Sequence, residues 1–342
     1  MSSSLRIGVV GCGFIADVIA HAIAEADDAV LSAAASRRRE SAEAFAAKHG
    51  ASRVFGSWEE LVASDAVDAV YVATPTVLRE AVSIAAARGG KHVLADKPFL
   101  SLPSVQAITA ACRKAGVAFL DATHFTHHPR TALLKRERAQ RIGTLEAVQS
   151  VFFFPNTDRA NIRYDATKEP TGAIGDMAWY SMRAAAEFLP PEATPVRVSA
   201  EGTRDPVTGT WVRSAGCIRF SDGSTTTWDA GFTVGALVMD LSLFGRDGSI
   251  HMDDYVLDWA GGMLGCDPGV PVGFVQRNGP VAPPAFQRVA TPSPKRQAVR
   301  MIEHLVQLSR DPNGPEALEA IRLACRTQAL VDLVAEAVRR ES

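Results

Sequence analysis

The segment LRIGVVGCGFIA, residues 5–16, decides the fold of this chain. Residues 5–10 are mostly apolar and rich in β-branched side chains, which predicts a buried parallel strand. The pattern G-x-G-x-x-A follows, in which Gly11 permits a tight turn, Gly13 lets the backbone approach a pyrophosphate, and Ala16 allows close packing of a helix on the strand. An apolar-periodic helix is expected from Val18 to Ala26. Strand, glycine loop and helix together predict a dinucleotide-binding domain that holds phosphates at the helix N-terminus.

The end of the second predicted strand indicates which dinucleotide binds. That strand, Val30 to Ala35, runs into Ser36, Arg37, Arg38 and Arg39. An NAD-binding fold usually has Asp or Glu in this zone, whereas arginine offers a planar donor fork that suits a 2′-phosphate. A solvated helix start is the alternative, but cations are unfavourable at a helix N-terminus. The cluster therefore predicts NADP, with NAD less favoured.

Two later strands end in further candidate loops. The strand over 66–73 closes on Thr74, Pro75 and Thr76, and the strand over 91–95 ends in Asp96-Lys97-Pro98. Ligands bind at the carboxyl ends of the strands in such parallel sheets. The residues expected to contact the cofactor are Gly11, Gly13, Phe14, Ile15, Ser36, Arg37, Arg38, Thr74, Pro75, Asp96 and Lys97.

Length, charge and cysteine content limit the class of protein. The chain has 342 residues, enough for two domains, and a net charge of −2, which gives no general attraction to nucleic acid or membranes. No apolar run reaches the roughly 18–20 residues of a membrane span, and we expect no signal peptide. Five widely spaced cysteines indicate buried thiols in a reducing cytoplasm.

The order of the motifs carries a family resemblance. G-x-G-x-x-A, A-S-R, A-T-P-T, D-K-P, H-H-P and G-A-I-G-D-x-x-x-Y follow one another as in the glucose–fructose oxidoreductase / inositol dehydrogenase family (Gfo/Idh/MocA). The chain is most similar to its dihydrodiol and D-xylose dehydrogenase branch. The resemblance implies an α/β fold, with a doubly wound Rossmann domain over 1–122 and an α+β domain over 123–342 that contains a large open antiparallel sheet. It also implies hydride transfer to or from sugars, polyols or dihydrodiols, and a homodimer or homotetramer formed through the open sheet face.

The resemblance also implies a catalytic set. Lys97 matches the lysine of the family's E-K-P motif, and Asp176 and Tyr180 match positions of its catalytic helix. A tyrosine is a poor base near neutral pH, and a nearby ammonium such as that of a lysine makes it a better one. The alternatives are a solvated lysine, a half-buried core tyrosine and an aspartate that serves the helix dipole.

Three departures from the family pattern stand out. The motif is D-K-P rather than E-K-P, Arg79 stands where the family often has histidine near the nicotinamide, and Ala178 replaces a glycine. Arg79 leaves the contacts on the nicotinamide side open.

Several residues are candidates for the substrate cleft. His127 and Arg163 are expected to contact the substrate, with interdomain hydrogen bonding as the alternative for the histidine. Trp179 is a further candidate, with core packing as its alternative. The run of His124, His127 and His128 lacks the Cys or acidic partners of a zinc site, so no metal is expected. Asp176 and Tyr180 lie at i and i+4 of one predicted helix, Ala173 to Phe188, with Arg183 as a neutralising partner of Asp176.

The second domain is predicted in outline. Alternating strands separated by Asp-Gly turns should form a sheet with one face packed on helices and one mixed face. Residues 265–294, rich in proline and glycine, are predicted to form a long loop, and 295–309 and 315–340 two amphipathic helices.

Three functions remain open at this point. The first is an NADP-dependent dehydrogenase or reductase acting on a carbohydrate-like small molecule, and the second is a sugar-nucleotide 3-ketoreductase. The third is a non-catalytic NAD(P)-binding sensor or co-repressor, which would need neither Lys97 nor Tyr180.

Overall fold

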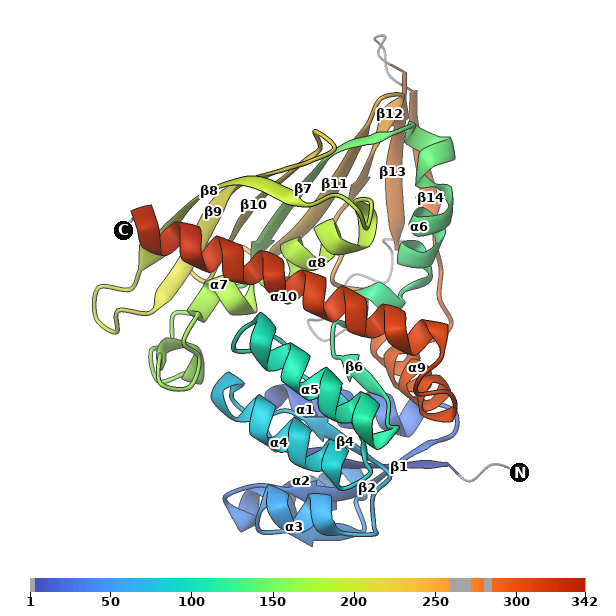
Figure 1. Ribbon diagram of the computed structural model, residues 1–342, viewed down its shortest axis with the longest axis vertical. Helices are drawn as coiled ribbons and strands as arrows, with labels where there is room; N and C mark the ends of the chain where they lie inside the picture. The colour runs from blue at the N-terminus through green and yellow to red at the C-terminus, as the bar shows by residue number, and fades with distance from the viewer. Residues whose placement is uncertain (1–3, 259–271, 280–284, 342) are drawn as a thin grey trace. The chain divides into compact units, whose positions relative to one another are not determined.

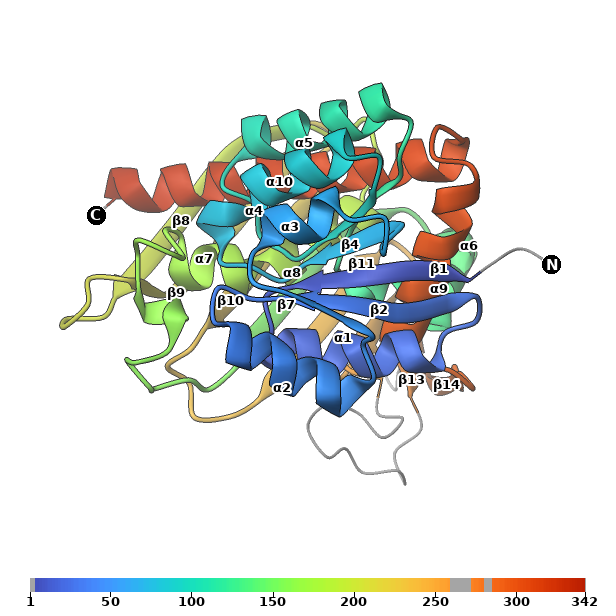
Figure 2. The same cartoon turned by 90° about the horizontal axis from the view of Figure 1, so that it is seen from below.

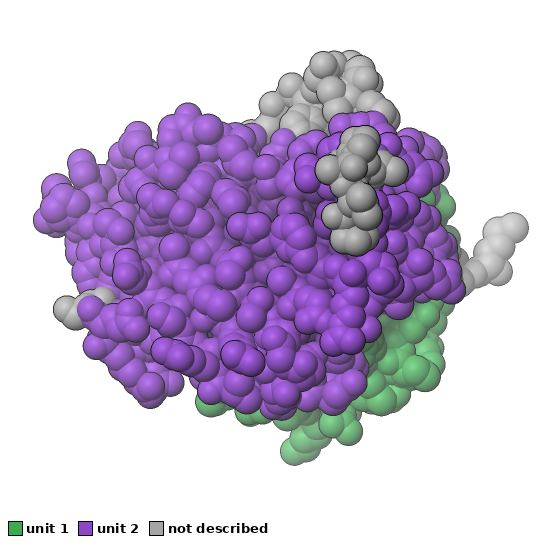
Figure 3. All heavy atoms as spheres, turned by 90° about the horizontal axis from the view of Figure 1, so that it is seen from above, with its two compact units in different colours: residues 1–124, 297–325 green, residues 125–296, 326–342 purple. Residues whose placement is uncertain are grey.

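The computed structural model describes residues 4–258, 272–279 and 285–341, which belong to two compact units (Figure 3). Unit 1 comprises residues 1–124 and 297–325, and unit 2 comprises residues 125–296 and 326–342. The chain therefore returns to the first unit near its C-terminus. The predicted domain boundary after residue 122, which assigns all later residues to the second domain, stays a prediction.

Unit 1 is built on a six-stranded parallel sheet with a Rossmann strand order. Its strands, in spatial order, are β3 (Arg53–Phe55), β2 (Ala29–Ala35), β1 (Leu5–Val10), β4 (Ala69–Val72), β5 (His92–Ala95) and β6 (Phe119–Asp121). The strand order reverses between β1 and β4, and ligands bind at such a switch point, beyond the carboxyl ends of the strands. The predicted doubly wound fold is confirmed.

Helices cover both faces of this sheet. They are α1 (Phe14–Glu25), α2 (Arg39–His49), α3 (Trp58–Ala63), α4 (Thr76–Arg88), α5 (Leu102–Ala115), α9 (Gln297–Arg310) and the first part of α10 (Pro315–Glu341). Figure 2 shows α1 and α2 on one face and α3, α4 and α5 on the other. Helix α9 packs on α1, so its buried Ile302 and Leu305 join the core around Ile7 and Ile23. A segment nearly 300 residues from the glycine loop thus completes the hydrophobic core of this unit.

Unit 2 is built on an eight-stranded, mostly antiparallel sheet (Figure 1). Its strands, in spatial order, are β14 (Ala285–Ala290), β13 (Gly273–Asn278), β12 (Gly248–Met252), β11 (Val238–Gly245), β7 (Leu145–Phe153), β10 (Thr225–Gly231), β9 (Trp211–Phe220) and β8 (Pro195–Arg204). Among the described pairings, only that of β7 with β10 is parallel. The predicted α+β domain with a large sheet is confirmed.

One face of the second sheet packs against helices. Helix α6 (Pro129–Ile142) lies on β11, β12 and β13, α7 (Gly172–Asp176) on β9, and α8 (Ala178–Phe188) on β7 and β10. The burial of alternate residues follows this arrangement: Val212 and Ile218 of β9 are buried, whereas Arg213 and Cys217 are half-buried and Arg219 is exposed. The other face therefore carries the mixed side chains that the alternation predicts.

The prediction of one long loop over 265–294 is wrong for the described part of that range. β13 and β14 lie within it and pair antiparallel, and the rest of the range up to residue 284 lies largely outside the described residues. The high proline and glycine content of the whole range led to the loop prediction, although the range contains the two short strands β13 and β14. Gly273 pairs with Ala290, and only a glycine fits there, because a Cβ would lie 2.1 Å from the carbonyl oxygen of Val289.

The predicted helix over Ala173–Phe188 is interrupted. Helix α7 ends at Asp176 and α8 begins at Ala178, with Met177 between them still in helical conformation at φ −92° and ψ −48°. The N–H of Tyr180 donates to the carbonyl of Met177 at 3.2 Å, one residue closer along the chain than in a regular α-helix. Two glycines in the five residues of α7 weaken helical propensity there, so the ladder breaks next to them.

Two other sequence predictions concern the whole chain. Among the described residues, no helix combines the length and apolar character that crossing a bilayer requires. Cys12, Cys112, Cys217 and Cys325 are free thiols, and Cys266 lies outside the described residues.

Candidate active site

The glycine loop forms an open cradle at the N-terminus of α1. Gly11 has φ +96°, and a Cβ on it would lie 2.6 Å from the carbonyl oxygen of Ala73 at the end of β4. Gly13 is the N-cap residue of α1, no side chain caps that helix end, and nothing lies within 4 Å of a Cβ built on Gly13. Phe14 is 64% exposed and Ala16 is fully buried. The first N–H groups of α1 are thus left for an outside acceptor, as a pyrophosphate requires.

The basic cluster lies where the second strand meets α2. Ser36 is half-buried, and its hydroxyl oxygen accepts a hydrogen bond from the N–H of Arg38 at 3.4 Å. Arg39 begins α2 and pairs with Glu43 at 3.0 Å. Arg37 and Arg38 are exposed, and among the described residues neither side chain forms an ion pair. Two guanidinium groups therefore stay available beside the strand end.

The loop after β4 contributes a buried hydroxyl at the switch point. Thr74 is 7% exposed, and its Oγ1 has no hydrogen-bond partner among the described residues. Pro75 is the N-cap residue of α4 and so offers no side-chain hydrogen bond to the helix. An unsatisfied buried hydroxyl is unusual and is typical of a binding site.

The loop after β5 is fixed by a side chain whose role the sequence left open. Arg79, 6% exposed in α4, donates to Thr76 Oγ1 at 2.7 Å and to the carbonyl oxygen of Pro98 at 2.5 Å. Both of those bonds use Nη1, whereas Nη2 lies 3.9 Å from a carboxylate oxygen of Asp96. Asp96 in turn accepts a hydrogen bond from the backbone N–H of Lys97 at 2.9 Å. Arg79 therefore holds both sides of the Asp96-Lys97-Pro98 turn.

Lys97 is buried and acts electrostatically on a neighbouring histidine. Lys97 is 8% exposed. Burial and, second, the positive charge of Lys97 lower the pKa of His124 to about 4, so His124 is neutral near neutral pH. The Nδ1 atom of His124 lies 2.8 Å from the side-chain nitrogen of Gln297 in α9, which makes Nδ1 the acceptor. No pattern in the sequence pointed to Gln297.

In unit 2, Tyr180 lies in an aromatic cluster. It is 8% exposed and its ring stacks on Phe152 with centroids 4.5 Å apart and planes within 5°. Phe125 contacts both Tyr180 and Tyr255, and the pKa of Tyr255 is raised above its ordinary range, chiefly by burial. The phenol of Tyr255 therefore stays protonated, and the ring of Tyr180 is held in a fixed orientation.

Asp176 pairs with a residue from a distant loop. Its carboxylate oxygen lies 2.5 Å from Nε of Arg163, in the short helix η2 (Ile162–Tyr164). Arg163 stays 34% exposed, whereas the Asp176 side chain is 12% exposed. Arg183, the partner expected from helical spacing, forms a buried pair with Glu187 at 2.9 Å. The structure thus brings two predicted site residues, Asp176 and Arg163, together.

The remaining candidates have mixed surroundings. Trp179 is fully buried, which favours the core-packing alternative, and His127 is half-buried. His128 caps α6, because its Nδ1 accepts the N–H of Arg130 at 3.0 Å. The cofactor candidates and Lys97 lie in unit 1, and Tyr180, Asp176, Arg163, His127 and Trp179 lie in unit 2. The role of each stays a prediction.

Comparison with known proteins gives matches to both units. Residues 5–122 match the model of the oxidoreductase family with an NAD-binding Rossmann fold, GFO/IDH/MocA. Residues 132–251 match the GFO/IDH/MocA C-terminal domain.

Characterised relatives act on polyols, sugars and sugar nucleotides. The chain is 33% identical over 168 residues to scyllo-inositol 2-dehydrogenase (NADP(+)) IolU of Bacillus subtilis. The aligned region covers only 49% of this chain and 49% of that enzyme. It is 32% identical over 230 residues to D-xylose 1-dehydrogenase (NADP(+)) 2 of Haloferax volcanii, which covers 67% of the chain and 70% of the relative.

A solved structure resembles the whole chain. A tyrosine-to-phenylalanine variant of KijD10, a 3-ketoreductase from Actinomadura kijaniata, in complex with TDP-benzene and NADP, superposes with a TM-score of 0.85 at 25% identity over 98% of both chains. Structures of that enzyme include variants in which a tyrosine is replaced by phenylalanine and a lysine by alanine or glutamate. The chain therefore belongs to the GFO/IDH/MocA family of NAD(P)-dependent oxidoreductases.

Proposed function

We propose that the protein is an NADP-dependent oxidoreductase that acts on a hydroxyl or carbonyl carbon of a sugar, polyol or dihydrodiol. The observation that carries the proposal is the buried Lys97, held by the Arg79 network at the carboxyl edge of a Rossmann sheet. The open N-terminus of α1 supports dinucleotide binding at the same edge. When bound, the nicotinamide supplies or accepts the hydride.

In the proposed mechanism, side chains of the protein transfer the proton of the substrate hydroxyl group. In the direction of oxidation, Tyr180 accepts the hydroxyl proton of the substrate, and in reduction it returns that proton to the carbonyl oxygen. The ammonium of Lys97 favours the anionic phenolate and donates a hydrogen bond to the reacting oxygen. Asp176, whose charge is balanced by Arg163, orients the neighbouring polar groups. No step requires a metal ion.

Preference for NADP is proposed from the basic cluster. Arg37 and Arg38 are exposed and free of ion pairs with described residues, while Ser36 lies at the strand end. A 2′-phosphate matches this set of donors, whereas a free ribose hydroxyl does not need it. The relatives named as NADP(+) enzymes support the same choice.

We expect Arg37→Ala to weaken NADP(H) binding by roughly 10- to 100-fold and NAD(H) binding by far less. The loss corresponds to one charge-assisted hydrogen bond, about 1.5–3 kcal/mol. Fluorescence titration with NADPH and NADH measures both constants. Arg113→Ala removes an exposed arginine from the end of α5 and serves as the charge-matched control. An equal loss for both cofactors in Arg37→Ala would show that the arginine is only structural.

We expect Arg79→Ala to lower both stability and kcat. The change removes the donors to Thr76 and Pro98 and leaves a buried carbonyl without its partner, which costs about 1–3 kcal/mol of unfolding free energy. Because the Lys97 turn loses its support, kcat should fall while the KM for NADPH changes less. Thermal unfolding and steady-state kinetics measure the two effects. Arg88→Ala, at the exposed end of the same helix, should change neither stability nor kcat. Wild-type stability and kcat in Arg79→Ala would contradict the proposal that Arg79 supports the Lys97 turn.

A sugar-nucleotide 3-ketoreductase is the second candidate. The structural likeness to KijD10 over nearly the whole chain favours it, together with four dTDP-sugar 3-reductases that are 32–35% identical over part of the chain. These relatives align over 54–56% of this chain, so the extent of the match does not select this substrate class over the first.

One screen separates the candidates. NADPH oxidation and NADP⁺ reduction are followed with aldoses, inositols, dihydrodiols, anhydro-sugars and keto-sugar nucleotides. Turnover of a free sugar, polyol or dihydrodiol supports the first function, and turnover confined to keto-sugar nucleotides supports the second. Tight NADPH binding without turnover of any class would overturn both and favour a non-catalytic sensor.

A homodimer or homotetramer through the mixed face of the second sheet is also proposed, as is a cytoplasmic location. Alternate residues such as Ala147, Val151 and Phe153 of β7 are only half-buried on that face. We expect light scattering to give a mass at least twice that of one chain. A monomer at micromolar concentration would contradict the proposed assembly.

A further inference from the structure

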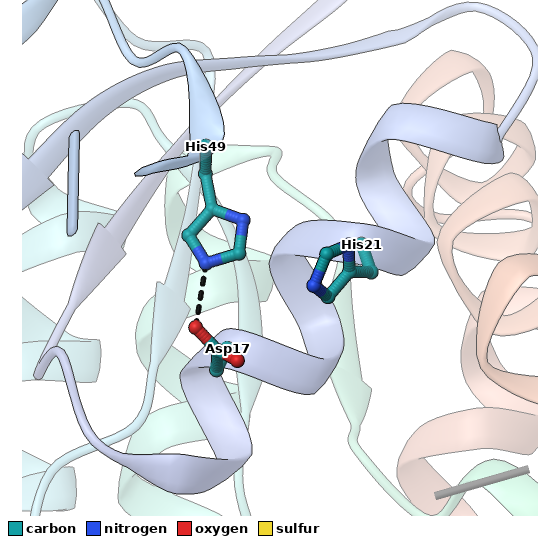
Figure 4. A group of neighbouring side chains, drawn as sticks. All are labelled: Asp17, His21 and His49. Atoms are coloured by element: carbon teal, nitrogen blue, oxygen red, sulfur yellow. Dashed lines mark hydrogen bonds and ion pairs between the residues drawn. The ribbon is translucent and has the colours of Figure 1, made fainter. Parts of the chain in front are cut away.

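Three potential metal ligands of unit 1 converge where the first half of α1 meets the end of α2, away from the D-K-P turn in the chain. Asp17 lies in the first turn of α1, His21 lies one turn later on the same helix, and His49 ends α2. Figure 4 shows the imidazole of His49 above Asp17, with His21 beside them. One ligand atom of each residue lies within 4.8 Å of those of the other two.

The geometry is close to that of a three-ligand metal site. His49 Nε2 lies 2.6 Å from Asp17 Oδ1, and the ring centroids of His21 and His49 lie 4.9 Å apart. Ligand bonds of about 2.0–2.2 Å place two ligands of a tetrahedral zinc ion about 3.4 Å apart. The His49–Asp17 contact must therefore open, and the third ligand must approach, before all three can bind one ion.

The site differs in two ways from a surface cluster of acids. His49 is nearly buried, with its side chain 4% exposed, and its ring packs on Phe45 with centroids 4.7 Å apart. It is therefore pre-positioned, while His21 is exposed and free to turn. Second, the carboxylate already binds a cation: the ammonium of Lys48 lies 2.7 Å from both oxygens of Asp17.

The pattern of charges indicates what a metal ion would replace. The Asp17 carboxylate contacts both the ammonium of Lys48 and the imidazole of His49. The ammonium of Lys48 is 57% exposed and can swing into water. An ion entering between Asp17 and His49 displaces that ammonium and the hydrogen bond between the two side chains.

We propose that Asp17, His21 and His49 form a binding site for a divalent transition-metal ion, separate from the catalytic machinery. Two imidazoles and one carboxylate suit Zn²⁺, Co²⁺ or Ni²⁺, and they do not suit Mg²⁺ or Ca²⁺, which prefer oxygen ligands. Water completes the coordination. Because Asp17 lies four residues after Gly13, the ion would sit beside the first turn of the helix whose N-terminus is proposed to hold the pyrophosphate.

A second cluster provides an internal comparison. Asp240, His251 and Asp253 also lie within 4.8 Å of one another, but this set has a single imidazole. The side chains of His251 and Asp253 are 42% and 59% exposed, and His251 Nδ1 already contacts Ser242 at 2.8 Å. We therefore assign the ion to the first cluster and use the second as a control.

The test is metal binding by the complete, untagged protein. Calorimetric titration with Zn²⁺ should show about one equivalent bound per chain. Visible absorption of the Co²⁺ complex should have the bands expected for nitrogen coordination. His21→Asn should weaken binding by at least about tenfold, and His251→Asn should leave it unchanged. Both histidines are on the surface, so neither change threatens folding.

Lys48→Met gives the sharpest result. Removing the competing ammonium should tighten Zn²⁺ binding by about tenfold, whereas a site that does not include Asp17 would not respond. The proposal is overturned if the wild-type protein takes up no Zn²⁺ at 100-fold excess, if His21→Asn binds as tightly as wild type, or if Lys48→Met leaves the affinity unchanged.

Discussion

We expect the replacement of Tyr180 with phenylalanine to lower kcat by roughly 10²–10⁴-fold and to leave NADPH binding nearly unchanged. The change removes one hydroxyl and keeps the ring that stacks on Phe152, so the aromatic cluster is preserved. What is lost is the hydroxyl that we propose accepts or returns the substrate proton. Steady-state kinetics in both directions and fluorescence titration with NADPH measure the two quantities.

Tyr255→Phe is the matched control for this experiment. Tyr255 belongs to the same cluster, and its hydroxyl lies 3.4 Å from Ser150. Burial raises the pKa of Tyr255 far above its ordinary value, so this phenol cannot act as a base. We expect a small loss of stability and little change in kcat. Full activity in Tyr180→Phe would remove the proposed mechanism.

We expect the replacement of Lys97 with methionine to have an effect of similar size. Methionine is close to lysine in length but carries no charge, so kcat should fall by roughly 10²–10⁴-fold while NADPH still binds. A second readout tests the placement of the charge. Because Lys97 lowers the pKa of His124, this pKa should rise in the variant, which NMR titration of the histidine detects.

Lys91→Met serves as the control for Lys97→Met. Lys91 precedes β5, whereas Lys97 follows it. The ammonium of Lys91 donates to the carbonyl oxygen of Val67 at 2.9 Å. Loss of that bond affects stability slightly and leaves the pKa of His124 as it was. An unchanged kcat in Lys97→Met would show that the buried lysine is structural.

The parallel sheet of unit 1 could be predicted because its signals are local. Apart from the three-residue β3, which was not predicted, each strand is a short apolar run that ends in a glycine, proline or polar turn and is followed by a helix. Helix starts were less accurate: α1 begins at Phe14 rather than Val18, since Gly13 caps the helix without any polar side chain to mark it. Helices α9 and α10 were predicted within a few residues.

The candidate site was harder to predict, because its contacts link residues that are far apart in the chain. Arg79 reaches a carbonyl 19 residues away, and His124 contacts Gln297 across 173 residues. Helical spacing suggested Arg183 as a partner of Asp176, but it gave no sign of Arg163, whose guanidinium donates to the Asp176 carboxylate. Residue types could be read from the motifs, but the pairs they form depend on how the loops fold back.

The Arg79 network changes how two departures from the family pattern should be understood. The family often has histidine at the position of Arg79 and glutamate at that of Asp96, so this chain has a longer basic side chain facing a shorter acidic one. The two groups lie 3.9 Å apart in this chain, so both departures fall on a single contact. We therefore interpret the two differences as a single coupled substitution, in which each change is neutral only in the presence of the other. Among related sequences, histidine with glutamate and arginine with aspartate should then be the pairs that occur together.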